Sequence, residues 1–423
     1  MKFVLASYGS RGDAEPCVAL GCELLRRGHD VHVAVAPDMV GFVESAGLAA
    51  VGYGPDARKW LDAFRAFLTQ LTRAPWRVKD LSKLWRENRA LLSQYLDDTN
   101  TTLIRLAEDA DLLLTGVLGE DAAANVAEYY NVPLATLHFL PFRAHGQLSP
   151  LLPGTLQRKA MILSQWLQWR MLLKKAEDRQ RGELGLPRAK SPSPRRITER
   201  GSLEIQAYDE MWFPEVAAEW AHIGYNRPFV GALTVELPTH ADDEVASWIA
   251  EGTPPIFFGF GSQPVESGAA TIAMIGAACE ELGERALVCS GWSDLSNIPH
   301  FDHVKVVDAV SYAAIFPSCR AVVHHGGIGS TAAGLRAGVP TLILSMMQDQ
   351  AALGAVVKRL GVGTTRRFSS SNRESLVADL RTILTPQYAA QAREVATRMT
   401  KPAESVACAA SLLEDFARFK SVG

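Results

Sequence analysis

The segment His325-Gly326-Gly327-Ile328-Gly329-Ser330 is the most informative stretch of this chain. It follows the apolar run 320–323, which predicts a buried strand, and precedes the run 331–338, which predicts a helix. A glycine turn at this junction leaves backbone N–H groups unpaired, and the helix dipole adds partial positive charge. The pattern favours a diphosphate cradle in which His325 donates a further hydrogen bond. The alternative is a tight strand-to-helix turn without a ligand.

The same order of strand, glycine turn and helix is predicted in both halves of the chain. Residues 2–7 predict a strand, 9–13 a loop and 14–27 a helix, and the order restarts with a strand and turn at 255–262. Such β-α-β units form parallel sheets. The fold class predicted is α/β, with two doubly wound, Rossmann-like domains that face a cleft. The expected parts are a domain 1–230, a linker 231–240, a domain 241–403, and a C-terminal helix 404–423 that packs back on the first domain.

Composition is that of an ordinary globular protein. The chain has 423 residues, of which 48% are hydrophobic and 21% charged, and a net charge of -3. No apolar run approaches the length of a transmembrane helix, and the N-terminal run is too short for a signal peptide. The six cysteines are scattered without metal-ligand spacing. We therefore expect a cytoplasmic protein, and a monomer.

The overall charge hides two basic stretches. Residues 143–200 hold thirteen Lys/Arg against four Asp/Glu, and residues 58–89 hold nine against three. Both also carry Trp and Leu, which favours contact with the inner face of the membrane and an amphiphilic acceptor. The alternative is an ordinary solvated helix face. Nucleic-acid binding is not expected, because the chain is slightly acidic and lacks a recognition motif.

Polar residues follow several of the predicted strands. Asp13 is expected at a helix N-terminus, as an N-cap, as a carboxylate that takes a proton from a substrate hydroxyl, or as both. Ser262 follows a glycine turn and can hold a phosphate, and Asp349-Gln350 can bind adjacent sugar hydroxyls. For both, the alternative is a purely structural turn or cap.

Two further candidates are aromatic. Trp292 can form the wall of a nucleobase slot or pack between domains. His138 ends a strand and either lines the acceptor side, with Ser10, or is a satisfied core histidine. No paired-histidine metal motif and no intact Gly-x-x-x-x-Gly-Lys phosphate loop occur in the sequence.

These motifs together resemble the bacterial family 1 glycosyltransferases with the GT-B fold. The similar relatives are the glycopeptide-antibiotic, sterol and mycobacterial glycopeptidolipid glycosyltransferases. The segments that carry the resemblance, in the order of the family, are 9–16, 259–262, 290–295, 324–331 and 349–350. The resemblance is specific in the C-terminal half and loose from about 55 to 230, where acceptors are bound.

The resemblance implies an inverting, metal-independent transfer of a hexose or deoxyhexose from a UDP- or dTDP-sugar. No cofactor is implied, since the nucleotide sugar is a co-substrate. Asp13 would be the general base, and the first domain would bind the acceptor. The donor would contact the diphosphate-binding residues Ser262, His325, Gly327, Ile328, Gly329 and Ser330, the sugar-binding residues Asp349 and Gln350, and, around the base, Trp292 and the backbone of Ala309 and Val310.

One departure from the family concerns the base. Plant relatives use an N-terminal histidine supported by an aspartate, whereas the opening loop here has no histidine, so Asp13 would act directly. The acceptor would be a glycolipid, lipopeptide, sterol or natural-product aglycone. Two alternatives stay open: an epimerase-like GT-B enzyme that acts on a sugar nucleotide, and a nucleotide-sugar-binding auxiliary protein without activity.

Overall fold

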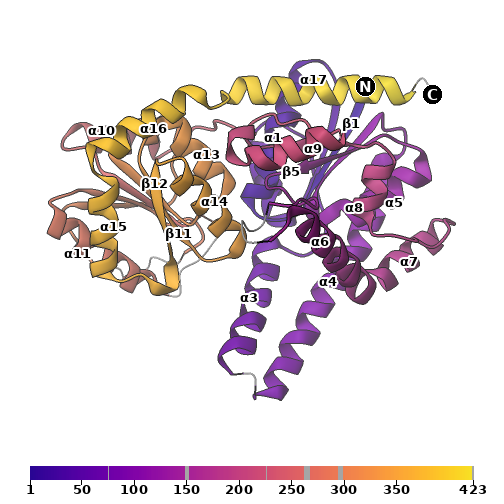
Figure 1. Cartoon of the computed structure of the whole chain (residues 1–423), viewed down its shortest axis with the longest axis horizontal. Helices are drawn as coiled ribbons and strands as arrows, with labels where there is room; N and C mark the ends of the chain where they lie inside the picture. The colour runs from indigo at the N-terminus through magenta and orange to yellow at the C-terminus, as the bar shows by residue number, and fades with distance from the viewer. Residues whose placement is uncertain (75, 148–151, 225, 262–266, 294–298, 422–423) are drawn as a thin grey trace. The chain divides into compact units, whose positions relative to one another are not determined.

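The computed structural model describes residues 1–74, 76–147, 152–224, 226–261, 267–293 and 299–421. The chain divides into two compact units, one of residues 1–235 with 402–423 and one of residues 236–401. Each unit contains a six-stranded parallel sheet with helices on both faces (Figure 1). The predicted α/β class with two doubly wound domains is confirmed.

The first sheet has the order β3-β2-β1-β4-β5-β6. Its strands are β1 Lys2–Ser7, β2 Asp30–Val35, β3 Ala50–Gly52, β4 Leu112–Gly116, β5 Leu134–His138 and β6 Leu203–Gln206. The helices of this unit are α1 Arg11–Arg26, α2 Val40–Ser45, α3 Ala57–Arg73, α4 Val78–Ala107, α5 Glu120–Tyr130, α6 Gly154–Gln168, α7 Lys174–Glu183, α8 Ser193–Glu199, α9 Pro214–Ile223 and α17 Pro402–Ser421. A π-helical turn, Trp169–Leu173, joins α6 to α7.

The second sheet has the order β12-β11-β10-β7-β8-β9. Its strands are β7 Ile256–Gly259, β8 Ala286–Cys289, β9 Val304–Val307, β10 Ala321–His324, β11 Thr341–Ser345 and β12 Gly363–Arg367. The helices are α10 Asp242–Ala250, α11 Gly268–Leu282, α12 Tyr312–Ile315, α13 Ile328–Ala337, α14 Gln348–Arg359, α15 Arg373–Ile383 and α16 Pro386–Arg398. Single 3-10 turns occur at Pro37–Met39, Val117–Gly119, Glu210–Trp212, Phe316–Ser318 and Phe368–Ser370.

Alternation along the strands builds the core on both faces of the second sheet. Phe257 packs with Val245 of α10 and Phe316, whereas the next residue, Phe258, packs with Ile272 of α11 and the residues of α15. Successive side chains of a strand point to opposite faces, so a continuous apolar run suits a strand that is covered on both sides.

Three strands were not predicted, namely β3, β6 and β12. Strand β3 has only three residues, and β6 carries Glu204 and Gln206 among its four. Strand β12 reads Gly-Thr-Thr-Arg-Arg at a sheet edge, without an apolar run. Periodicity cannot identify strands this short or this polar, because it needs several apolar positions on one face.

The C-terminal helix α17 belongs to the first unit and packs on α1. Arg27, which follows α1, donates to Glu414 at 3.0 Å and to the carbonyl of Ala407 at 3.0 Å. His29 lies 2.6 Å from the same Glu414 carboxylate. No helix in the described part of the chain is long and apolar enough to cross a membrane.

Candidate active site

The loop between β1 and α1 positions the carboxylate of Asp13. Helix α1 begins at Arg11, three residues earlier than predicted, so Ser10 is the N-cap and Asp13 lies in the first turn. Asp13 is therefore not the N-cap that the sequence suggested. Its Oδ2 accepts from the backbone N–H of Ser10 at 2.8 Å, and the Ser7 hydroxyl donates to its carbonyl oxygen at 2.8 Å. A carboxylate in this position also interacts favourably with the helix dipole.

Gly9 makes room for this carboxylate. Its φ is +141°, a conformation that side chains rarely adopt, and a methyl group built there would lie 2.2 Å from Oδ2 of Asp13. Glycine is thus required by both its backbone conformation and the close approach of the carboxylate.

We expect Gly9→Ala to displace the carboxylate of Asp13, the predicted base, and to lower turnover at least about tenfold, because a small misplacement of a catalytic group is costly. Gly41→Ala in α2 is the matched control, since a methyl group there meets nothing within 4 Å. Initial rates and thermal midpoints of both variants would be compared with wild type. Full activity of Gly9→Ala would show that the loop tolerates the change.

His138 lies at the carboxyl end of β5 and is completely buried. Its Nε2 is 2.7 Å from Oε1 of Glu120, and its Nδ1 is 3.2 Å from the Gln206 amide nitrogen. Burial, and then the charge of Arg143, lower the pKa of His138, which favours the neutral ring. Both ring nitrogens thus have hydrogen-bond partners among buried side chains. We therefore regard His138 as a residue that positions Glu120 rather than one that contacts an acceptor.

Glu120 belongs to a buried ionic network that sequence reasoning missed. Arg143 donates to both Glu120 oxygens, at 2.8 and 2.9 Å, and also to Glu204. Glu204 in turn accepts from Arg227 at 3.2 Å. Burial alone would raise the pKa of Glu120, but Arg143 and His138 hold it at about 2. The network ties the loop after β5 to β6, and only the position of Glu120 just after β4 hinted at it.

In the second unit, the turns that follow β7, β8, β10 and β11 lie along one edge of the sheet, because the strands are parallel. Neighbouring strands β10 and β7 end side by side, with His324 paired to Gly259, and β8 ends beside β7 with Cys289 paired to Gly259. From β7 the chain continues to β8 and β9 on one side, and from β10 it continues to β11 and β12 on the other side. The position between β7 and β10, where the strand order reverses, is the topological switch point at which doubly wound sheets bind ligands.

His325 lies at this switch point, between two glycines. A methyl group at Gly327 would come within 2.6 Å of the His325 Nε2, and one at Gly261 within 2.9 Å of its Cε1. Burial lowers the pKa of His325 to about 4, and the backbone of Gly259 opposes this fall without reversing it. Neutral imidazole therefore predominates near pH 7 and can donate one N–H.

His324 stabilises the turn between β10 and α13. It is completely buried, and its Nδ1 accepts from the backbone N–H of Gly326 at 3.0 Å. Burial, and then His325, lower the pKa of His324 to about 3, so it too is neutral. This hydrogen bond to Gly326 holds the backbone of the turn that leads into α13, and it thereby positions the neighbouring His325.

Helix α13 provides the backbone groups of the predicted cradle. Gly327 is its N-cap, and Ile328, Gly329 and Ser330 form its first turn, whose N–H groups have no acceptors within the helix. Ser330 is 8% exposed and Gly329 would meet nothing with an added methyl group. The structure thus brings His325 and this first turn together, as the sequence predicted. Ser262 lies outside the described residues.

The predicted nucleobase residues follow β8 and β9, which are neighbouring strands. Trp292 is half-buried, and its backbone N–H donates to the carbonyl of Gly261 at 3.0 Å, which ties the turns after β7 and β8 together. Ala309 is exposed, whereas the side chain of Val310 is buried in the core. Val310 could therefore face a ligand only through its backbone.

Asp349 and Gln350 lie in the first turn of α14, but they differ in exposure. Asp349 is exposed. Gln350 is buried, and its Oε1 accepts from the backbone N–H groups of Met346 and Met347 at 2.8 and 3.1 Å. Its side-chain oxygen thus holds the turn after β11, which leaves the NH2 of its amide as the group suited to a sugar hydroxyl.

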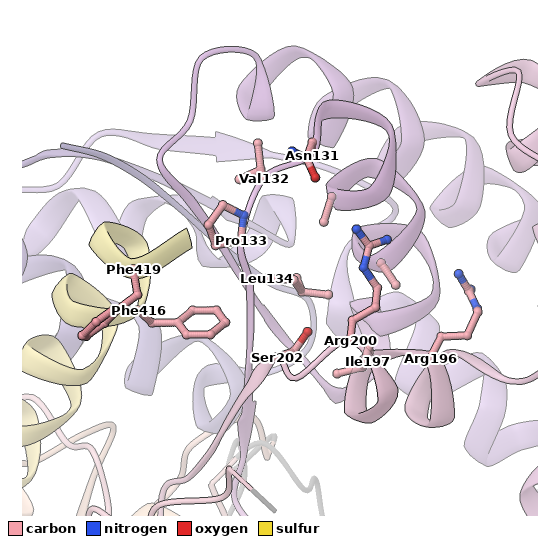
Figure 2. Close-up of a pocket in the computed structure, with 12 residues that line it drawn as sticks. Asn131, Val132, Pro133, Leu134, Arg196, Ile197, Arg200, Ser202, Phe416 and Phe419 are labelled. Atoms are coloured by element: carbon pink, nitrogen blue, oxygen red, sulfur yellow. The ribbon is translucent and has the colours of Figure 1, made fainter. Parts of the chain in front are cut away.

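A separate cavity of about 240 Å³ lies in the first unit at the amino end of β5, the sheet edge opposite to Asp13 (Figure 2). Phe416 and Phe419 of α17 line one side, and Arg196 of α8 and Arg200, which follows that helix, line another. None of the residues predicted for catalysis or donor binding lines it. The sequence did not indicate this cavity, because its walls come from segments about 200 residues apart.

Comparison with known proteins agrees with this geometry. Residues 286–413 match the family described as erythromycin biosynthesis protein CIII-like, C-terminal domain. An uncharacterized glycosyltransferase of Mycobacterium tuberculosis is 58% identical over 421 residues, which cover 99% of both chains. A sterol 3-beta-glucosyltransferase of Arabidopsis thaliana is 27% identical, over 94% of this chain and 65% of that relative.

Solved structures show the same fold. The calicheamicin glycosyltransferase CalG4 superposes with a TM-score of 0.68 at 18% identity and 98% coverage of both chains. The glycosyltransferase VinC, in complex with dTDP, superposes with a TM-score of 0.64 at 18% identity and full coverage of both. The two doubly wound sheets, with glycine turns at the carboxyl ends of their strands, are those of a GT-B protein. The mycobacterial relatives then show that the chain belongs to the family 1 glycosyltransferases of this fold.

Proposed function

We propose that this glycosyltransferase moves a hexose or deoxyhexose from a UDP- or dTDP-sugar to a hydroxyl of an amphiphilic acceptor, with inversion and without a metal. The observation that carries the proposal is the His325 imidazole held against the first turn of α13 by Gly261 and Gly327. An imidazole N–H and the helix N-terminus together suit the charge of a departing diphosphate. The dTDP and thymidine diphosphate complexes of VinC and SsfS6 support a nucleotide donor.

The proposed reaction is a single displacement. The acceptor hydroxyl gives its proton to the Asp13 carboxylate, and its oxygen forms a bond to the anomeric carbon of the sugar. The bond from that carbon to the diphosphate oxygen breaks, and the nucleoside diphosphate leaves with the electron pair. His325 and the N–H groups of residues 328–330 stabilise the negative charge that develops on the leaving oxygens, in place of a cation.

Donor selection would use the other strand-end turns. Asp349 and the Gln350 amide are proposed to bind sugar hydroxyls, since a carboxylate accepts and an NH2 group donates. Trp292 would stack on the nucleobase, and the backbone at Ala309 and Val310 would read its edge. Ser262 is proposed for the second phosphate.

The proposed acceptor is amphiphilic. Trp60 supports this, because it is the half-buried member of an aromatic cluster beside the opening loop, whose ring centroids are 4.5 to 6.1 Å apart. The other members, Tyr8, Tyr53 and Tyr95, are buried. Tyr8 follows β1 and precedes Gly9, so the cluster is close in sequence to Asp13. The similarity to the sterol 3-beta-glucosyltransferase of Arabidopsis thaliana, whose name states its acceptor class, supports it more distantly.

The test is product analysis. The enzyme would be incubated with UDP- and dTDP-sugars and with lipid extracts, and mass spectrometry would detect the glycosylated product. The anomeric proton coupling in its NMR spectrum would report inversion. Free sugar and nucleoside diphosphate without a conjugate, or an epimerised sugar nucleotide, would contradict glycosyl transfer to an acceptor. Turnover that requires an added divalent cation would contradict the metal-independent mechanism.

Donor binding is expected to take up a proton. The pKa of His325 is about 4 in the free protein, and a bound anion favours the imidazolium, so binding raises this pKa. A ligand that raises the pKa of a group binds more tightly to the protonated form of that group. Its affinity therefore increases as the pH falls from above the pKa in the complex towards the pKa in the free protein. Affinity for UDP-glucose or dTDP-glucose should therefore increase as pH falls within the range from 6.5 to about 4.

Calorimetry in two buffers of different ionisation enthalpy would measure this uptake. A sugar nucleotide is the right probe, because its diphosphate diester does not titrate in this range, unlike a free nucleoside diphosphate. His325→Ala is the control and should remove the uptake. Equal uptake in the variant would mean that another group takes the proton.

A further inference from the structure

The α3–α4 hairpin of the first unit has apolar side chains at its tip that no part of the described protein covers. From residue 58 to residue 90, every described side chain is half-buried or exposed, and burial begins only at Leu91. Figure 1 shows the two helices extending away from the sheet of their own unit. The far half of the hairpin therefore packs only against itself.

The hairpin has an inner seam that is distinct from its tip. Phe67 and Trp85 pack across the two helices with ring centroids 5.8 Å apart, and the Asn88 amide donates to the carbonyl of Ala63 at 3.0 Å. The ring contact covers part of this seam, although Trp85 remains 51% exposed. At the tip, Leu71, Trp76 and Val78 are 44%, 74% and 66% exposed.

Basic residues surround this tip. Residues 71–86 contain five Lys/Arg and one Asp, a net charge of +4 in a chain whose total is -3. Arg77 and Lys83 are 66% and 73% exposed, and their nearest carboxylate oxygens, on Asp80 and Glu87, are both 3.9 Å away. Such long, solvated pairs leave most of the positive charge available to an anionic surface.

The second basic stretch differs, because much of its charge is neutralised within the protein. Arg143 pairs with Glu120 and Glu204, Arg181 pairs with Glu128 at 2.9 Å, and Arg196 pairs with Glu177. Exposed apolar side chains also occur on α6 and the π-helical turn after it, at Leu156, Ile162, Leu163, Trp166, Leu167, Met171 and Leu172. The hairpin tip differs in its denser basic charge, with five Lys/Arg in residues 71–86 against three in residues 152–172. Trp and aliphatic residues with nearby Lys/Arg are the combination that partitions to the interface of anionic bilayers.

We propose that the tip of the α3–α4 hairpin, formed by Leu71, Trp76 and Val78 with Arg77, Lys79 and Lys83, docks on a membrane surface that contains anionic lipid. The apolar side chains enter the headgroup region, and the basic side chains contact lipid phosphates. This inference deepens the proposed function, in that the amphiphilic acceptor would be taken from the same surface. Charge complementarity selects a bilayer over a neutral apolar partner.

The test uses the full chain and phosphatidylcholine vesicles with and without phosphatidylglycerol. Wild type should co-sediment with the anionic vesicles, and roughly 1 M salt should weaken binding, because the screening length falls to about 3 Å. The double variant Trp76→Ser/Val78→Ser should bind at least about tenfold more weakly. Both substituted side chains are exposed, so the thermal midpoint should not change.

The matched control is Tyr129→Ser in α5, which removes an exposed aromatic side chain from another face, 48% exposed, and should bind as wild type does. Failure of wild type to bind anionic vesicles would overturn the proposal and point to a protein partner. Equal binding by wild type and the double variant would overturn the assignment to the tip.

A second readout separates this inference from the proposed function. Transfer to a detergent-dispersed acceptor should be unchanged in the double variant, whereas transfer to the same acceptor embedded in anionic vesicles should fall about tenfold. Vesicle binding without transfer to any acceptor would refute the proposed function and leave the docking surface standing. Equal loss on both acceptor forms would refute the docking role.

Discussion

Asp13→Asn is expected to lower kcat for glycosyl transfer by roughly 10²-fold or more, because an amide cannot take the acceptor proton. Asparagine keeps an oxygen that can accept from the Ser10 N–H, the contact that Oδ2 makes at 2.8 Å. The opening loop should therefore retain its shape. Donor affinity, measured by calorimetry, should stay within a few-fold of wild type, since the donor is proposed to bind the second unit.

Two comparisons separate the chemical role from the capping role of this carboxylate. Asp13→Ala should lose activity to the same extent and also about 1 kcal/mol of stability, the usual loss for a helix-terminal acceptor. Asp38→Asn changes a carboxylate that likewise caps a helix, accepting from the N–H groups of Ala57 and Arg58 at 2.9 and 3.1 Å. It should keep full turnover. Near-normal turnover in Asp13→Asn would exclude Asp13 as the base.

The second large effect is expected for His325→Ala, whose kcat/KM should fall roughly 10²-fold, as for loss of a donor that stabilises developing charge. Unlike the Asp13 variants, it should also weaken donor binding, because the imidazole is proposed to contact the diphosphate in the ground state as well. Steady-state rates at several donor concentrations and calorimetry with the same donor would measure both effects.

His300→Ala is a suitable control for this variant. His300 lies in the same unit, and its side chain is 88% exposed beside Asp302. Its removal should leave donor affinity and turnover unchanged. Donor affinity of His325→Ala within about threefold of wild type would contradict the diphosphate contact, since hydrogen bonds to charged groups contribute about 1.5–3 kcal/mol.

Much of the fold could be predicted because its signals are local. The apolar runs at 2–7 and 320–323 and the glycine turns that follow them are readable within a few residues. The right-handed β-α-β rule then converts that order into parallel, doubly wound sheets. The predicted start of α1 is three residues too late, because Gly12 and Asp13 are typical loop residues, although Asp13 here stabilises the first turn by accepting from the Ser10 N–H.

The candidate site was predictable where it depends on strand ends. His325 and residues 327–330 follow one strand and open one helix, so their proximity is a consequence of chain order. The role of Gln350 was not predictable in the same way, because its oxygen is used by the backbone of Met346 and Met347. Sequence proximity does not report which atom of a side chain is already bonded.

Periodicity and glycine turns act over a few residues. The amino-acid sequence is therefore sufficient to predict the alternation of strands and helices, the two halves, and the polar groups at the carboxyl ends of the strands. Which charges are buried and which are exposed depends instead on the tertiary fold. Arg143 lies in the interior because Glu120 and Glu204, 23 and 61 residues away, offset its burial. Trp76, in contrast, stays exposed because no third element packs on the tip of its hairpin in the described protein. Burial and pairing depend on segments that only folding brings together.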